Sequence, residues 1–222
     1  MGRDNNVSKS ALVIVDVQND FCPGGSMAVA GGDQIISPIN TLLQNKAGPQ
    51  RSLFQKVVAT ADWHPPHHVS FAQEHEGHSE YEVVEADGLQ QNLWPVHCLA
   101  GSEGAALHPE LDQRYLDLIL HKGTQVGLDS YSAFFENDGT TSTGLHGYLQ
   151  EFEINQVYIV GLALDWCVYF TALDARRLGY MTILMEDLSR PVDVPTGFAE
   201  QRLAALREKR VIIESSSETY YE

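Results

Sequence analysis

Short apolar runs alternate with helical patterns along this chain, and that alternation is typical of a parallel sheet covered by helices. The first run, at 11–16, reads ALVIVD and has the continuous apolar character of a strand buried on both faces. Further strands are expected at 56–61, 118–122, 156–160, 181–186 and 211–214, and helices at 33–43, 145–152, 165–178 and 198–207. The sequence therefore predicts an α/β fold with a mostly parallel, doubly wound sheet.

Two helix starts and one helix end depend on particular residues. Asp33 and Asp165 are expected to cap the first and third helices, and Gly179 follows the third helix in the C′ position. Residues 62–102 are instead rich in His, Gly and Pro and show little periodicity. A connection of this length within a compact domain usually carries function.

Length and charge limit the possible functions. The 222 residues suit one domain, so we expect a single domain over 1–222 with a polar extension at 1–10. The formal net charge of −16 disfavours nucleic acid and anionic membrane surfaces as partners. No apolar run approaches the roughly 20 residues that span a bilayer, and residues 1–10 lack the apolar core of a signal peptide. These features predict a cytoplasmic protein.

Three reactive side chains fall at or just beyond expected strand ends, namely Asp16, Lys122 and Cys167. Open parallel sheets bind ligands beyond the carboxyl ends of their strands, so we expect these side chains to meet there. Cys167 would occupy the second position of a helix capped by Asp165, where unpaired N–H groups and the helix dipole lower a thiol pKa. Position alone leaves open a buried structural cysteine, a capping Asp16 and a solvated Lys122.

The irregular connection offers a set of metal ligands. Asp62 and His64 are two residues apart and would point the same way in an extended segment. His97 could be a third ligand, and one carboxylate with two imidazoles suits zinc, iron or manganese. His68 is a candidate for an additional ligand or for a supporting role, whereas Cys98 is expected to serve packing.

Aromatic side chains accompany these segments. Phe21 follows the first strand, Trp94 precedes His97, and Tyr131 follows Lys122. They could form part of the core or of a lid, or they could form a flat slot for a planar ring. The three cysteines (Cys22, Cys98 and Cys167) do not suggest a disulfide framework, because their number is odd.

Five separated motifs resemble those of the isochorismatase-like (cysteine hydrolase) superfamily. The run DVQNDF at 16–21 resembles its opening motif. The other four resemble the nicotinamidase branch: DWHP at 62–65, WPVHC at 94–98, KG at 122–123 with YSAF at 131–134, and GLALDWCV at 161–168. The motifs follow the family's order over residues 11–191.

The resemblance implies a three-layer α/β/α fold with a six-stranded sheet. It also implies catalytic residues Asp16, Lys122 and Cys167, and metal ligands Asp62, His64 and His97. A cis peptide between Leu162 and Ala163 would direct the Ala163 N–H, with that of Cys167, at an oxyanion. Residues at the positions of Phe21, Trp94 and Tyr131 enclose a pyridine ring in this family.

The activity that the resemblance implies is hydrolysis of nicotinamide to nicotinate and ammonia through a Cys167 thioester, as a step of NAD salvage. The implied cofactor is a divalent metal ion, taken as Zn²⁺ with Fe²⁺ and Mn²⁺ as alternatives. Nicotinamide is the expected small-molecule partner, and a homo-oligomer remains open.

Three other functions remain to be weighed. The chain could be a related amidohydrolase acting on a ureido or carbamoyl compound, although such relatives generally lack the metal pair. It could be a non-catalytic binding module, but none of the three catalytic residues is lost. A structural metal protein would normally require four protein ligands, and the sequence offers three strong ones.

Overall fold

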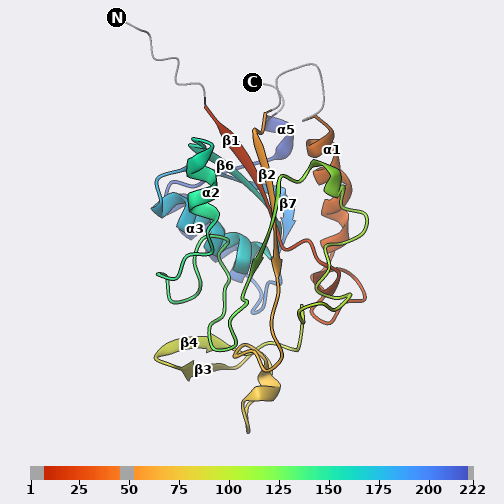
Figure 1. The fold of residues 1–222 in the computed structure, drawn as a ribbon, viewed down its shortest axis with the longest axis vertical. Helices are drawn as coiled ribbons and strands as arrows, with labels where there is room; N and C mark the ends of the chain where they lie inside the picture. Colours follow the sequence, from red (N-terminus) through yellow and green to blue (C-terminus); the bar gives the residue numbers. More distant parts are fainter. Residues whose placement is uncertain (1–7, 46–52, 220–222) are drawn as a thin grey trace, which may run out of the picture.

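The computed structural model of the chain describes residues 8–45 and 53–219 (Figure 1). Within these ranges six strands form one sheet in which every neighbouring pair is parallel. From edge to edge the strands are β5 Leu118–Lys122, β2 Lys56–Asp62, β1 Ser10–Val15, β6 Gln156–Leu162, β7 Met181–Arg190 and β8 Ile212–Glu214. The predicted α/β sheet is confirmed. The first seven residues of the expected extension at 1–10 lie outside the described residues.

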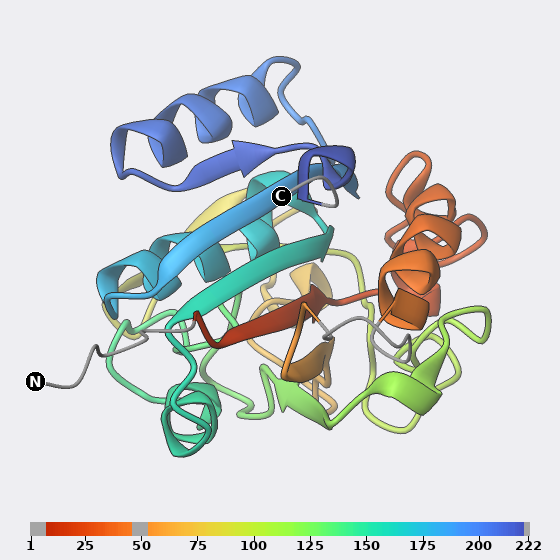
Figure 2. The ribbon, with the colours of Figure 1, turned by 90° about the horizontal axis from the view of Figure 1, so that it is seen from above.

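Helices cover both faces of this sheet and make three layers (Figure 2). One face packs against α1, and the other packs against α2, α3 and α4. Alternate residues of β1 point to opposite faces of the sheet. Leu12 and Ile14 pack in the hydrophobic core that contains α1, whereas Ala11 and Val13 pack in the core on the other face. The helices are α1 Ile36–Asn45, α2 Leu145–Glu151, α3 Tyr169–Arg177, α4 Phe198–Glu208 and the short α5 Ser216–Thr219. Every one of them is too short to cross a bilayer as an apolar span.

A close approach of two backbones brings the ends of β1 and β6 together. Gly161 has φ +119, and a Cβ atom there would lie 2.1 Å from the carbonyl oxygen of Val15. Only glycine fits this contact, because a side chain would collide with the neighbouring main chain. The segments that follow these two strands carry Asp16 and Cys167 respectively, so the contact helps to bring those residues to one place.

Both predicted aspartate caps are wrong. A 3₁₀ turn, Gly32–Ile35, leads into α1, and Asp33 lies inside this turn without capping it. Asp165 lies inside a π-helical turn, Leu164–Val168, that precedes α3. Its carboxylate instead accepts hydrogen bonds from the backbone N–H groups of Val192 at 3.0 Å and Asp193 at 2.8 Å. The predicted C′ position of Gly179, with φ +93, is confirmed.

The long connection at 62–102 contains a hairpin that the sequence did not predict. Strands β3 Val83–Ala86 and β4 Leu89–Asn92 pair antiparallel and lie beyond the carboxyl end of the main sheet (Figure 1). Their sequences, VVEA and LQQN, are short and lack a clear apolar alternation, since most of these side chains are at least partly exposed. The hairpin therefore lies near the carboxyl edge of the sheet, where Asp16, Lys122 and Cys167 are expected to meet.

Candidate active site

Lys122, the last residue of β5, connects the reactive side chains at the carboxyl edge of the sheet. Its Nζ lies 2.9 Å from Asp16 Oδ2, 2.5 Å from Asp62 Oδ1 and 3.4 Å from Cys167 Sγ. It also donates to the Ser130 carbonyl oxygen at 2.9 Å. The side chain is fully buried, so these contacts compensate a charge that water does not reach.

The strand order explains this meeting. Asp62 at the end of β2 is the register partner of Lys122 at the end of β5. Asp16 directly follows β1, which is the other neighbour of β2. Cys167 follows β6, on the far side of β1. Four adjacent strands therefore bring four side chains to one edge, as predicted for three of them.

Thr60 contacts one carboxylate oxygen of Asp16, and Lys122 contacts the other. The Thr60 hydroxyl donates to Asp16 Oδ1 at 2.6 Å and accepts from the Asp16 N–H at 3.2 Å. Among the described residues, Oδ2 has the ionic contact with Lys122 but no well-aligned hydrogen bond. Burial raises the pKa of Asp16 to about 6, against the opposing effect of Lys122. Thr60 was not predicted, because a threonine within a buried strand looks like ordinary β-branched packing.

Cys167 does not have the acidic thiol that its expected helix position implied. Burial raises the pKa of the Cys167 thiol well above its usual value, and Lys122 only partly opposes this. Nearby Asp16 and Asp62 raise the pKa further. The thiol therefore carries its proton at rest, and a base is required to remove it.

Asp62, His64 and His97 form the predicted donor cluster, with one ligand atom of each within 4.8 Å of the others. Both imidazoles donate through Nδ1 to backbone carbonyls: His64 to Gly123 at 3.0 Å, and His97 to Pro95 at 2.7 Å. Each Nε2 is then left to bind a metal, and that of His64 lies 3.7 Å from Asp62 Oδ2, the third donor. Such hydrogen bonds through the other ring nitrogen orient ligating histidines in many sites. The residues therefore fit a divalent ion of the zinc, iron or manganese type.

The protonation of Asp62 and His97 favours a metal, whereas the pKa of His64 lies above its usual value, because the neighbouring Asp62 outweighs the lowering by burial. Burial alone would raise the pKa of Asp62, but Lys122, followed by His64, holds it below its usual range. Burial and the neighbouring His64 lower the pKa of His97 to about 4, which leaves a neutral imidazole. Gly123 allows the close packing here, because a Cβ at its φ of +61 would lie 2.6 Å from the His64 ring.

His68 lies beside this cluster. Its ring stacks on His64 with centroids 4.1 Å apart. Its Nδ1 contacts the Ser70 hydroxyl at 2.7 Å, and its Nε2 lies 3.4 Å from the Leu128 carbonyl oxygen. His68 also forms a second possible donor set with His64 and Asp129, so both the supporting role and the ligand role stay predictions.

A narrow pocket opens onto Cys167 and the donor cluster. The four predicted substrate contacts all line it: Phe21, Trp94, Tyr131 and Ala163. The peptide between Leu162 and Ala163 is cis. The sequence did not predict the other lining residues, which are Met27, Val29, Asp129, Trp166 and Val192. Of these, only Trp166 could have been predicted from the sequence, because it is an aromatic residue directly before Cys167.

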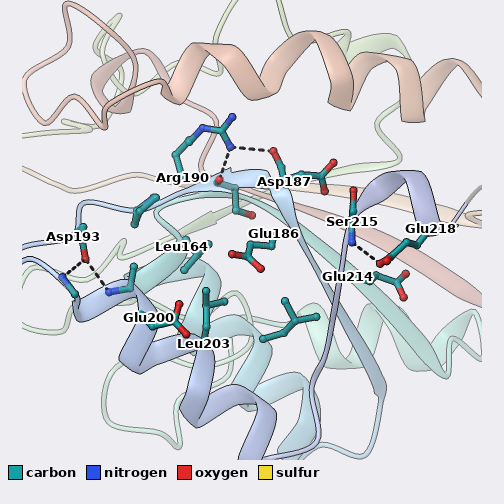
Figure 3. A pocket seen from close by; sticks show the side chains of 15 residues that line it. Leu164, Glu186, Asp187, Arg190, Asp193, Glu200, Leu203, Glu214, Ser215 and Glu218 are labelled. Atoms are coloured by element: carbon teal, nitrogen blue, oxygen red, sulfur yellow. Dashed lines mark hydrogen bonds between the residues drawn. The ribbon is translucent and has the colours of Figure 1, made fainter.

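A larger cavity, of about 700 Å³, lies elsewhere, between β7, β8 and α4 (Figure 3). Figure 3 shows carboxylates around it and one arginine, Arg190, whose guanidinium donates to the Asp187 carbonyl oxygen at 3.0 Å. None of the described residues that line it is a cysteine, histidine or lysine. The narrow pocket, rather than this cavity, therefore holds the reactive chemistry.

The sequence profile of the isochorismatase domain matches residues 10–210. The chain belongs to the isochorismatase family. A nicotinamidase of Acinetobacter baylyi is 45% identical over 192 residues, which cover 86% of each chain. The structure of a nicotinamidase and pyrazinamidase of Acinetobacter baumannii is 44% identical and superposes with a TM-score of 0.89, over 96% of this chain and 99% of the other.

Two more distant structures of the isochorismatase family contain ligands. The yeast nicotinamidase bound to the inhibitor nicotinaldehyde has a TM-score of 0.86 at 31% identity, covering 93% of this chain and 100% of the other. A pyrazinamidase of Pyrococcus horikoshii in complex with zinc has a TM-score of 0.74 at 29% identity, covering 93% and 99%. The family and these relatives confirm the predicted enzyme class, a hydrolase of amide bonds.

Proposed function

We propose that this chain hydrolyses nicotinamide to nicotinate and ammonia through a thioester on Cys167, as a step of NAD salvage. The observation that carries the proposal is the position of Cys167, which contacts Lys122 at 3.4 Å and lines one pocket with Asp62, His64 and His97. Curated nicotinamidases at 44–45% identity support this substrate.

Asp16 is the proposed base. Its Oδ2 takes the proton from the Cys167 thiol, and the sulfur attacks the carboxamide carbon. A pKa of about 6 suits this role, because the carboxylate is largely ionised at neutral pH yet still accepts a proton readily. Thr60 keeps the other carboxylate oxygen in place through its 2.6 Å hydrogen bond. The proton then passes from Asp16 to the departing nitrogen, which leaves as ammonia.

The negative charge of the tetrahedral intermediate requires stabilisation. The backbone N–H groups of Ala163 and Cys167 are assigned to the oxyanion, since both residues line the pocket. Lys122 lowers the energy of the negative charge that moves between sulfur and carboxylate, because its Nζ contacts both. Water then attacks the thioester carbon and gives a proton to Asp16, and the released thiolate recovers that proton.

The aromatic residues would orient the substrate. Phe21, Trp94 and Tyr131 line the pocket and offer flat faces to a pyridine ring. A divalent metal held by Asp62, His64 and His97 would supply a Lewis acid for the ring nitrogen. Holding the amide beside Cys167 in this way removes much of the entropic cost of reaction, roughly 7 kcal/mol or more in model systems.

The function is tested by measuring ammonia release from nicotinamide, benzamide and a ureido compound, before and after treatment with a chelator. We expect nicotinamide to have the highest kcat/KM, and benzamide to lose on the order of 100-fold because it lacks the ring nitrogen. Chelation should suppress turnover, and added zinc should restore it. A preference for the ureido compound, or turnover indifferent to chelation, would favour the alternative amidohydrolase.

Replacing His97 by alanine is expected to strip the metal and to raise KM more than it lowers kcat. Loss of a supporting contact alone often weakens metal binding by about 10–100-fold, so loss of a direct ligand should cost at least that much. Asp62→Ala should act in the same direction. Elemental analysis of the purified variants measures the effect.

His78→Ala is the matched control, because the His78 side chain is exposed and forms a polar contact with Glu82. It should retain the wild-type metal content. Full metal occupancy in both Asp62→Ala and His97→Ala would remove these residues from the metal site.

A further inference from the structure

Asp20 lies in the turn after β1, yet its side chain binds the segment that carries a metal-donor histidine. Its Oδ2 accepts a hydrogen bond from the backbone N–H of Cys98 at 2.7 Å, across 78 residues of chain. Cys98 directly follows His97, one of the three candidate donors. Asp20 itself lies outside the cluster of donors, so it could influence a bound metal only through other residues.

The backbone of Cys98 lies between the two donor histidines. Its nitrogen is joined covalently to His97, and its carbonyl oxygen accepts a hydrogen bond from the His64 N–H at 2.9 Å. The His64 carbonyl oxygen in turn accepts from the Ala100 N–H at 2.8 Å, so the segment after His97 pairs with the main chain of His64. A shift of Cys98 would therefore move the two imidazoles relative to each other.

Cys98 has a backbone conformation that needs support from its surroundings. Its φ is +46, in the left-handed region that residues with a Cβ atom rarely adopt. Such conformations persist where neighbouring contacts hold them in place. A carboxylate is a strong acceptor for a peptide N–H, because its charge shortens and strengthens the hydrogen bond. The contact with Asp20 is therefore suited to hold Cys98 in this conformation.

The Asp20 carboxylate is itself fixed by two further segments. Its Oδ1 accepts from the Ser26 N–H at 3.2 Å. The Asp20 carbonyl oxygen accepts from the Met27 N–H at 3.0 Å, and the Asp20 N–H donates to the Gly104 carbonyl oxygen at 3.0 Å. A Cβ atom at Gly104 would lie 2.3 Å from Asp20 Oδ2, so a glycine is needed there to leave space for the carboxylate. These contacts set the direction from which Asp20 meets Cys98.

We propose that Asp20 is a positioning residue for the metal site, and that it acts through the Cys98 peptide to hold His64 and His97 in register with each other. The inference rests on the proposed function, because that function assigns a metal to these histidines. Partners outside the ligand set usually contact the second ring nitrogen of a histidine, as backbone carbonyls do here for both rings. Asp20 adds a different kind of support, since it fixes the main chain that joins the two ligands.

The test titrates the zinc-loaded protein with a chromogenic chelator, which gives the Kd for zinc, and follows the fold of the same samples by circular dichroism. Asp20→Ala should raise the Kd by about 10–100-fold, the usual effect of removing a supporting contact. Gly104→Ala should act in the same direction, because its methyl group displaces the carboxylate while Asp20 stays in place. It also provides a second variant if Asp20→Ala does not fold. A role in folding alone would leave the Kd of the folded variant unchanged.

Two control variants match these changes, and both should keep the wild-type Kd. Asp187→Ala also removes a carboxylate that accepts a backbone N–H, that of Ser216 at 2.8 Å, but Asp187 lines the larger cavity instead of the narrow pocket. Gly147→Ala adds a methyl group on the exposed side of α2, where no atom outside the helix backbone lies within 4 Å among the described residues.

An unchanged Kd in folded Asp20→Ala, or in Gly104→Ala where Asp20→Ala does not fold, would overturn the positioning role and leave the proposed metal site intact. A weakening of the same size in the control variants would also overturn it. A wild-type protein that binds no zinc would overturn the proposed metal site together with this inference.

Discussion

Replacing Cys167 by alanine is expected to lower kcat for nicotinamide by on the order of 10⁴-fold or more, because no other cysteine, and no serine or threonine, is among the described residues that line the pocket. Metal content should remain near that of the wild type, since Cys167 is not a member of the Asp62, His64 and His97 cluster. Steady-state ammonia release and elemental analysis on the same preparations measure the two effects.

Cys22→Ala is the appropriate control. Cys22 is also a buried free thiol, but it lines a different surface depression, away from the narrow pocket. Its replacement should leave kcat within about twofold of the wild type. Comparable activity in Cys167→Ala and Cys22→Ala would refute the assignment of the nucleophile.

Replacing Lys122 by methionine should have the largest effect on stability. Methionine conserves much of the volume but leaves the buried carboxylates of Asp16 and Asp62 without their common cation. Breaking a buried ion pair from one side typically costs about 3–5 kcal/mol. We therefore expect the free energy of unfolding to fall by about that amount, as measured by urea denaturation in the presence of a chelator.

Lys56→Met offers a matched comparison. Lys56 lies 3.9 Å from Asp117, and both side chains are partly exposed. Pairs of this kind are worth about 0–1 kcal/mol, so this variant should unfold close to the wild type. A similarly small loss in Lys122→Met would show that the three buried charges are not coupled in the way that their distances imply.

Much of the fold followed from pattern alone. The run at 11–16 predicted β1 closely, because a strand buried on both faces requires continuous apolar character. The position of Asp16, Lys122 and Cys167 at strand ends then predicted where they would meet. The candidate metal donors were predicted from residue type and spacing. Their assembly also depends on the Gly123 and Pro95 carbonyl groups, which accept hydrogen bonds from His64 and His97.

What the sequence did not predict depends on contacts between distant segments. Asp165 has the residue type of a helix cap, yet the loop at 192–193 provides its partners. The Cys167 thiol pKa follows burial and neighbouring carboxylates rather than position along a helix. Thr60 holds Asp16 from an adjacent strand, 44 residues away, which no local pattern reveals.

The most direct test of the proposed chemistry is rapid acid quenching of the wild-type enzyme during turnover of nicotinamide, followed by mass spectrometry of its peptides. Attack by the Cys167 sulfur predicts a nicotinoyl group on the peptide that contains Cys167, absent from the Cys167→Ala protein. A nicotinoyl group on another side chain, or rapid turnover with no acylated peptide in single-turnover experiments, would contradict it.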